Sequence, residues 1–341
     1  MDRISQVLLN CLAAQPISDF HLHAGKKLRV RLSGEIVEQA EIFEKQEIES
    51  FIEQGLGPAG WQDFRQSGDA DFAHLAAGQR FRANAYQMIG GPALALRVIP
   101  SEIPQLDRLG LPEAVHQVLG HRHGLVLVTG QTGSGKSTSL AAMIDAINQR
   151  ESGHIITIED PIEFVHQDKN CLISQREAGR DTSSFASALK AALRQDPDVI
   201  LMGELRDLET VSMALTAAET GHLVLATLHT NGAPDTVNRV IDLFPAGQQE
   251  QARGQLAASL LRVLTQQLLP AAGGGRIAAF EVMTGTPAVA NLIREGKTAQ
   301  LASILQTGHQ DGMITMQKYL EQLHKAGKIS QPAGAAPPAS G

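Results

Sequence analysis

The sequence is poor in aromatic residues, with ten Phe, two Tyr and one Trp, or 4% of its 341 residues. Because 43% of the residues are hydrophobic, its cores must be built mostly from Ala, Leu, Ile and Val. Only two cysteines occur, Cys11 and Cys171, and their wide separation offers neither a disulfide framework nor a CxxC metal site. The low number of cysteines excludes the small disulfide-rich domains and the cysteine-based zinc modules.

Long apolar runs are missing as well. No run approaches the roughly 18 residues that a membrane-spanning helix needs, and the N-terminal segment is too polar around its short apolar part for a signal peptide. The formal net charge of -7 gives no general electrostatic attraction to nucleic acid or anionic lipid. The sequence therefore predicts a cytoplasmic protein with no membrane span and no nucleic-acid partner.

The pattern of apolar residues divides the chain into two domains. Residues 1–100 alternate between segments of period two and a predicted helix around residues 45–55, which is typical of a small α+β domain. Prolines predict a linker at residues 101–118. In residues 119–330, apolar runs alternate with helical patterns, which predicts a doubly wound α/β domain with a mostly parallel sheet and a helical C-terminal part. The uncharged residues 331–341 are expected to form a disordered tail.

One predicted hairpin carries an unusual pair of charges. Residues 80–99, RFRANAYQMIGGPALALRVI, predict two strands around a turn at IGGP. A symmetric hairpin places Arg82 and Arg97 opposite each other, away from the apolar side chains, and like charges directly across a sheet are destabilising. We interpret the pair as a site for a strongly anionic ligand. The alternative is two solvated arginines that diverge through sheet twist and repel only weakly.

A phosphate-binding loop is the strongest motif in the chain. GQTGSGKST matches the pattern GxxxxGK[ST], with a buried strand at residues 125–128 before it and a helix at residues 137–148 after it. Backbone amides and the helix N-terminus would hold phosphate, while Lys136 would reach the β- and γ-phosphates and Ser137 would ligate Mg²⁺. The predicted nucleotide-binding residues of this loop are Gly130, Gln131, Thr132, Gly133, Ser134, Gly135, Lys136, Ser137 and Thr138. The sequence thus predicts a bound nucleotide and Mg²⁺.

Carboxylates follow two of the predicted strands. Glu204 stands at the Walker B position after the apolar run 199–202, where an Asp is more usual, and could help to hold Mg²⁺, partly through water. Glu159 and Asp160 end the strand before it in sequence, and Glu163 follows one turn later. Ligands of open α/β sheets bind beyond the carboxyl ends of the strands, so these acids are expected to converge on the loop. Solvated acids at strand ends are the alternative for any single one of them.

Two histidines and two basic residues complete the candidates. His229 ends the predicted strand in TGHLVLATLHT and is placed to sense the γ-phosphate, whereas His222 at its opposite end is interpreted as structural. Lys190 and Arg194 share the polar face of one predicted helix. Arg194 is a candidate nucleotide contact, and an interaction with the helix C-terminus is an equally good interpretation.

These motifs together resemble the secretion ATPases of type II and type IV systems, and within them the PilT-like type IV pilus twitching (retraction) ATPases. The resemblance covers nearly the whole chain. Its most specific segments are the Walker A motif GQTGSGKST, the Asp box TIEDPIEF, the Walker B segment DPDVILMGELRD, the His box TGHLVLATLHT and the arginine segment RFRANAYQMIGGPALALRVIP. It implies a PAS-like N-terminal domain followed by a RecA-like ATPase domain.

The resemblance also implies an activity, an assembly and a location. The expected protein is a homo-hexameric ring that hydrolyses ATP and works with the inner-membrane pilus platform protein and the pilus assembly machinery, from the cytoplasmic side of the pilus base. Glu163 would activate water, Glu204 would organise Mg²⁺, and Arg82 and Arg97 would reach ATP held at an adjacent domain.

Three departures from the family pattern bear on this expectation. Position 190 is Lys where the family usually has Arg, so a bidentate contact is lost. AVANLIRE resembles the characteristic AIRNLIRE helix of the retraction members, but Val289 and Ala290 replace Ile and Arg. The zinc-binding tetracysteine of the export and extension members is absent, which favours the retraction subclass.

Three other interpretations compete with a retraction motor. An accessory or regulatory paralogue with weak ATPase activity fits the altered AVANLIRE segment. A DNA-handling RecA-type ATPase is disfavoured by the acidic composition. A GTPase is disfavoured because no NKxD motif occurs. Basal ATPase activity separates the motor from the paralogue, and stimulation by DNA would single out the DNA-handling ATPase.

Overall fold

The chain folds into two compact units, of which the first spans Met1–Glu102 and the second begins at Ile103. The computed structural model describes all residues except Ser33, Ser101 and residues 331–341. The predicted disordered tail therefore lies outside the described residues. Within the described part of the chain, no helix is both long and apolar enough to cross a membrane.

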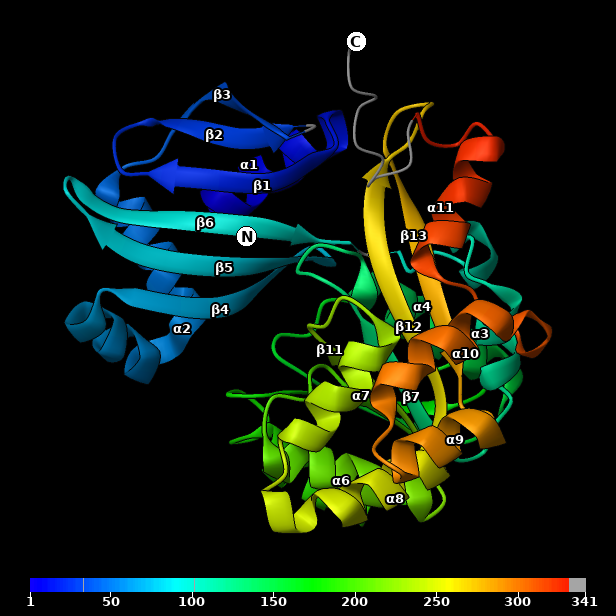
Figure 1. Ribbon diagram of the computed structural model, residues 1–341. Coiled ribbons are helices and arrows are strands. Elements are labelled where there is room, and N and C mark those ends of the chain that lie inside the picture. The colour runs from blue at the N-terminus through cyan, green and yellow to red at the C-terminus, as the bar shows by residue number, and fades with distance from the viewer. Residues whose placement is uncertain (33, 101, 331–341) are drawn as a thin grey trace. The chain divides into compact units, whose positions relative to one another are not determined.

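The first unit is a six-stranded antiparallel sheet with two helices, ordered β3-β2-β1-β6-β5-β4 (Figure 1). Its elements are α1 (Arg3–Ala14), β1 (Ile17–His23), β2 (Lys27–Leu32), β3 (Glu35–Ile42), α2 (Lys45–Ser67), β4 (Asp69–Ala76), β5 (Gln79–Met88) and β6 (Gly91–Ile99). Apolar residues of alternate strand positions pack against α1 and α2 in one core. This is the small α+β, PAS-like domain that the sequence predicts.

Two local features of this unit depend on glycine. The hairpin of β5 and β6 turns at Gly90 and Gly91, whose φ values of 106° and 122° suit glycine, and it pairs Arg82 with Arg97 as expected. Helix α2 extends well beyond the predicted residues 45–55. It breaks at Gly57, where φ is 71°, and Pro58 then starts its second part.

The second unit contains a seven-stranded sheet ordered β13-β12-β7-β11-β10-β8-β9, in which only the β12–β13 pair is antiparallel. Its strands are β7 (Gly124–Thr129), β8 (His154–Glu159), β9 (Leu172–Glu177), β10 (Val199–Met202), β11 (Leu223–Leu228), β12 (Leu260–Pro270) and β13 (Arg276–Thr284). The continuous apolar runs of β7, β10 and β11 are buried throughout, because helices cover both faces of the sheet. The doubly wound, RecA-like domain is confirmed.

Helices pack on both faces of this sheet (Figure 1). They are α3 (Glu113–Val118), α4 (Lys136–Arg150), α5 (Phe185–Ala192), α6 (Leu208–Glu219), α7 (Ala233–Asp242), α8 (Gln249–Ser259), α9 (Pro287–Arg294), α10 (Leu301–Thr307) and α11 (Met316–Lys325). Four short 3₁₀ segments are η1 (Leu106–Leu109), η2 (Ala246–Gln248), η3 (Thr298–Gln300) and η4 (His309–Asp311). One apolar cluster joins α3 and α4 to the sheet, and another joins α5 to α9 to its opposite face.

Two parts of this unit differ from the expectation. The C-terminal part contains α8, α9, α10 and α11 as predicted, but the long hairpin of β12 and β13 lies among these helices and was not predicted. Strand β12 pairs edge to edge with β7 and β13, and its consecutive residues 263–266 are all buried, so burial does not alternate along the strand. Residues 103–118 are not an open linker either, because they contain η1 and α3, whose leucines and valines are buried in the core.

Candidate nucleotide-binding site

Apart from Arg194, the predicted site residues of the second unit follow four strands that lie side by side in the order β7-β11-β10-β8. These strands are parallel, so their carboxyl ends meet at one edge of the sheet. The phosphate-binding loop follows β7, His229 follows β11, Glu204 follows β10, and Glu159 ends β8. The topology therefore brings the loop, both acidic segments and the histidine to one place.

The loop after β7 is curled around its own lysine. Gly130, Gly133 and Gly135 have φ values of 140°, 80° and 89°, a region that L-side chains rarely adopt. Lys136 starts α4 and is buried, and its Nζ donates hydrogen bonds to the carbonyl oxygens of Gly130 at 2.8 Å and Gln131 at 3.1 Å. The positive charge is thus held inside the loop, beside the helix N-terminus that favours phosphate.

The electrostatics of Lys136 connect the loop to the acids. Burial lowers the pKa of Lys136, while the negative charges of Glu204 and Glu163 act to raise it. Both carboxylates are therefore close enough to act on the ammonium group. Glu204 is half-buried, whereas Glu163 is exposed to solvent beside the loop.

Glu204 lies at the centre of a charged cluster. Its Oε2 accepts a hydrogen bond of 2.7 Å from Arg206 Nε, and its Oε1 lies 3.5 Å from His229 Nε2. Arg206 also faces Asp160, with 3.8 Å between Nη1 and Oδ2. Arg206 was missed at the sequence level, although its place two residues after the Walker B acid is a usable signal. The cluster joins three strand ends through close polar contacts.

The acidic segment after β8 is held by neutral hydrogen bonds. Glu159 Oε1 accepts from Thr157 Oγ1 at 2.7 Å and from Gln175 Nε2 at 3.3 Å, and its Oε2 lies 3.5 Å from the backbone N–H of Glu163. Burial raises the pKa of Glu159, and the charge of Glu163 acts in the same direction, while these hydrogen bonds oppose the shift. Glu159 supports the segment that presents Glu163.

The same segment is anchored by a buried histidine. His166 is 8% exposed, its backbone N–H donates to Gln175 Oε1 at 2.7 Å, and its Nδ1 has no hydrogen-bond partner among the described residues. Burial lowers the pKa of His166 from 6.5 to about 4, with Asp145 opposing the shift and Lys169 adding to it. The imidazole is therefore neutral in the folded protein at neutral pH.

This burial predicts a specific acid sensitivity. Between pH 6.5 and 4, the unfolded chain protonates His166 but the folded chain does not. The free energy of unfolding should therefore fall by about 1.4 kcal/mol per pH unit on acidification through this window. Denaturant unfolding of His166→Gln should show a shallower pH dependence there, whereas His324→Gln, at an exposed position of α11, should follow the wild type. Equal slopes for all three proteins would contradict the assignment.

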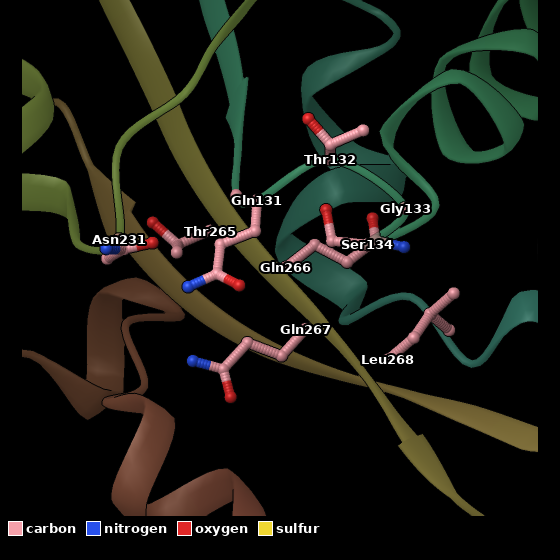
Figure 2. A pocket seen from close by; sticks show the side chains of 10 residues that line it. Gln131, Thr132, Gly133, Ser134, Asn231, Thr265, Gln266, Gln267 and Leu268 are labelled. Carbon is pink, nitrogen blue, oxygen red and sulfur yellow. The ribbon is translucent and has the colours of Figure 1, made fainter.

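A cavity of about 250 Å³ opens beside the loop (Figure 2). Amide and hydroxyl side chains from the loop, from β12 and from the segment after β11 face it. Its lining consists of Gly130, Gln131, Thr132, Gly133, Ser134, Asn231, Thr265, Gln266, Gln267 and Leu268. The β12 residues and Asn231 carry no sequence motif that the prediction used, so the strand next to the loop was missed. Ser137 and Thr138 lie half-buried in the first turn of α4.

Arg194 is not joined to this cluster by any contact among the described residues. Its Nη1 donates to the carbonyl oxygen of Lys190 at 2.9 Å, at the C-terminal end of α5. His222 likewise bonds locally, with Nδ1 3.0 Å from the carbonyl oxygen of Ala217. Arg194 thus contacts its own helix terminus, one of the two interpretations that the sequence allows.

Arg82 and Arg97 belong to the first unit, where a third residue changes their interpretation. Asp19 of β1 pairs with Arg97 across the sheet, and Arg97 Nε donates to its Oδ1 at 2.9 Å. Although burial acts to raise the pKa of Asp19, hydrogen bonds from Arg97 and Ser18 and the charges of Arg97 and Arg31 hold it below its usual value. Asp19 therefore offsets part of the repulsion between the facing arginines, so repulsion alone does not require an external anion, and their contact with ATP stays a prediction. Arg82 forms no ion pair with the residues that the structure describes.

Comparison with known proteins adds relatives that match almost the full chain. Residues 69–274 match the family described as "Type II/IV secretion system protein". An Escherichia coli K12 protein named "Uncharacterized protein YggR" is 49% identical, over 92% of this chain and 95% of the relative. The "Type IV pilus retractation ATPase PilT" of Pseudomonas aeruginosa is 47% identical, over 95% of both chains. A crystal structure of the pilus retraction motor PilT with bound ADP is 44% identical, covers 99% of this chain and 98% of its own, and has a TM-score of 0.90.

Proposed function

Because this chain belongs to the type II/IV secretion system ATPase family, binds nucleotide and is an ATPase, we propose that it is the motor that powers type IV pilus retraction and twitching motility. The observation that carries the proposal is the convergence of Lys136, Glu163, Glu204 and His229 at one sheet edge, in a chain that is similar to PilT along its length.

In this proposal, each residue of the edge has a defined role in hydrolysis. The loop amides and Lys136 hold the β- and γ-phosphates, and Glu163 takes a proton from the attacking water. His229 senses the γ-phosphate, Glu159 and Asp160 orient the acidic segment, and Arg194 adds a contact to the nucleotide. The Glu163 carboxylate is exposed beside the lysine, as a base that must reach solvent water requires.

The donor set fits Mg²⁺, which prefers hard oxygen ligands and retains several waters. The Ser137 hydroxyl would hold the ion directly and the Glu204 carboxylate would hold it partly through water, and the bound ion would neutralise charge on the transferring phosphate. Glu204 is engaged by Arg206 and His229, so these two contacts would have to yield when the carboxylate turns to the metal waters.

The assembly and the partners are also part of the proposal. We propose a homo-hexamer in which Arg82 and Arg97 reach ATP held by another ATPase domain. The arginine fork suits bidentate contacts to phosphate. The ring would act at the cytoplasmic side of the pilus base, on the inner-membrane platform protein and the pilus assembly machinery.

An accessory or regulatory role with weak ATPase activity is the second candidate. In α9, Val289 and Ala290 are buried, with exposures of 0% and 8%. Both side chains are apolar and pack into the core, so this helix lacks the arginine that the retraction members have at the position of Ala290. This feature favours a paralogue that joins the machine without generating most of its force.

A genetic test with one variant separates these functions. A strain lacking the gene should lose twitching and keep surface pili, and the wild-type gene should restore twitching. The Lys136→Ala gene should restore no twitching. The purified Lys136→Ala protein should show no measurable ATP hydrolysis, because the lysine charge that contacts the β- and γ-phosphates is gone. Near-normal twitching in the deletion strain, together with weak ATPase activity of the wild-type protein, would support the accessory role instead.

A further inference from the structure

Strand β12 lies directly against the phosphate-binding loop. It pairs with β7 in parallel, and the buried hydroxyls of Thr129 and Thr265 share a hydrogen bond of 2.9 Å across the two strands. Thr129 is the last residue before the loop, so this bond fixes the point where the loop leaves the sheet. The next residue of β12 is Gln266, which is 3% exposed and lines the cavity beside the loop (Figure 2).

Both framing glycines of the GxxxxGK motif abut this glutamine. A Cβ atom at Gly130 would lie 2.3 Å from the backbone oxygen of Gln266, and one at Gly135 would lie 2.8 Å from its Nε2. Real Cβ atoms essentially never come within 3.0 Å of another heavy atom, so a side chain at Gly130 would displace the loop or the strand, and one at Gly135 would displace the Gln266 amide. The loop therefore closes around Gln266 at its beginning and at its end.

The side-chain amide of Gln266 also holds the helix that follows the loop. Its Oε1 accepts a hydrogen bond of 2.7 Å from Ser139 Oγ, in the first turn of α4. Ser139 is 2% exposed, so water cannot replace this bond without a rearrangement. A buried donor without a hydrogen-bond partner is destabilising, because it has lost its hydrogen bonds to water and gained none in the protein. The bond thus fixes the start of α4, where the phosphate-facing amides are.

We propose that Gln266 is a positioning residue for nucleotide binding, which holds the loop in its phosphate-binding shape before the nucleotide arrives. Pre-organisation raises affinity because less conformational freedom is lost on binding. Gln266 acts on the nucleotide through the framing glycines and Ser139. This inference needs only nucleotide binding at the loop, and it stands or falls independently of pilus retraction.

The test measures ADP affinity by calorimetry for Gln266→Met, Ser139→Ala and the double variant. Each single change should weaken ADP binding about tenfold, which corresponds to about 1.4 kcal/mol. The double variant should be no weaker than the singles, because both remove the same bond. Ser259→Ala is the matched control. It removes another buried serine hydroxyl of the same unit, one that donates to the Gln255 carbonyl oxygen at 2.8 Å, and it should leave ADP affinity unchanged.

Thermal unfolding without nucleotide separates positioning from simple stability. All three single variants should melt below the wild type, yet only Gln266→Met and Ser139→Ala should lose ADP affinity. Unchanged ADP affinity in folded Gln266→Met, or an equal loss in Ser259→Ala, would overturn the proposal. If Gln266→Met does not fold, Ser139→Ala decides alone, because it removes one oxygen atom from the other end of the bond.

Discussion

ATP hydrolysis by a Glu163→Gln variant is expected to be at least about a hundredfold slower than by the wild-type protein, the scale of a lost general base. Glutamine keeps the shape of the side chain but cannot accept the proton of the attacking water. Nucleotide binding should remain nearly intact, because the loop and Lys136 are unchanged. The measurements are steady-state phosphate release at saturating ATP and ADP affinity by calorimetry.

Two further substitutions make this result interpretable. Glu204→Gln should slow hydrolysis by a similar factor while sparing nucleotide binding, and Glu250→Gln, at an exposed position of α8, should leave turnover at the wild-type level. A wild-type rate for Glu163→Gln would place the base elsewhere. Glu159 is then the next candidate, although burial raises its pKa and hydrogen bonds occupy both of its oxygens.

Mixed rings of two inactive variants are expected to recover part of the wild-type ATPase rate. Lys136→Ala chains lack a working phosphate-binding loop but present both arginines. Arg82→Ala/Arg97→Ala chains have a working loop but lack both arginines. If the arginines act on ATP held by another subunit, an interface between the two variants can combine the intact loop of one chain with the intact arginines of the other. Under subunit-exchange conditions, activity plotted against the mixing ratio should be bell-shaped, because arginines that meet transition-state charge accelerate phosphoryl transfer strongly.

A control on the same sheet face tests whether the arginine effect is specific. Arg29 of β2 is a salt-bridged and largely exposed arginine, and Arg29→Ala should remain active without any partner variant. Activity that stays at the level of the parents, after exchange has been demonstrated, would mean that Arg82 and Arg97 act within their own chain or not at all. Removing Arg97 also deprives Asp19 of a hydrogen bond, so the first unit is not expected to gain stability from the loss of like charge.

Local patterns were enough to predict the chemistry of the nucleotide site. The glycines and lysine of the loop are adjacent in sequence, and the strand before it and the helix after it are periodic over short windows. The acids and His229 follow apolar runs, and parallel topology alone brings such strand ends to one edge. The register of β5 and β6 could be predicted because a short turn sets it.

Only the tertiary structure decided the contacts between segments that lie far apart in the chain. Asp19 neutralises Arg97 from a strand 78 residues away, and Gln266 reaches Ser139 across 127 residues. Neither Asp19 nor Gln266 belongs to a recognisable motif. A single Asp or Gln in a strand indicates no contact until the strand register shows which residue lies beside it. The hairpin of β12 and β13 was likewise not predicted, because the buried residues 263–266 of β12 do not follow the alternating pattern of a half-buried strand. The sequence by itself determined the motifs and strand ends that carry the proposed chemistry. The fold decided which neighbours hold them in place, because side-chain periodicity is local whereas register and packing join distant residues.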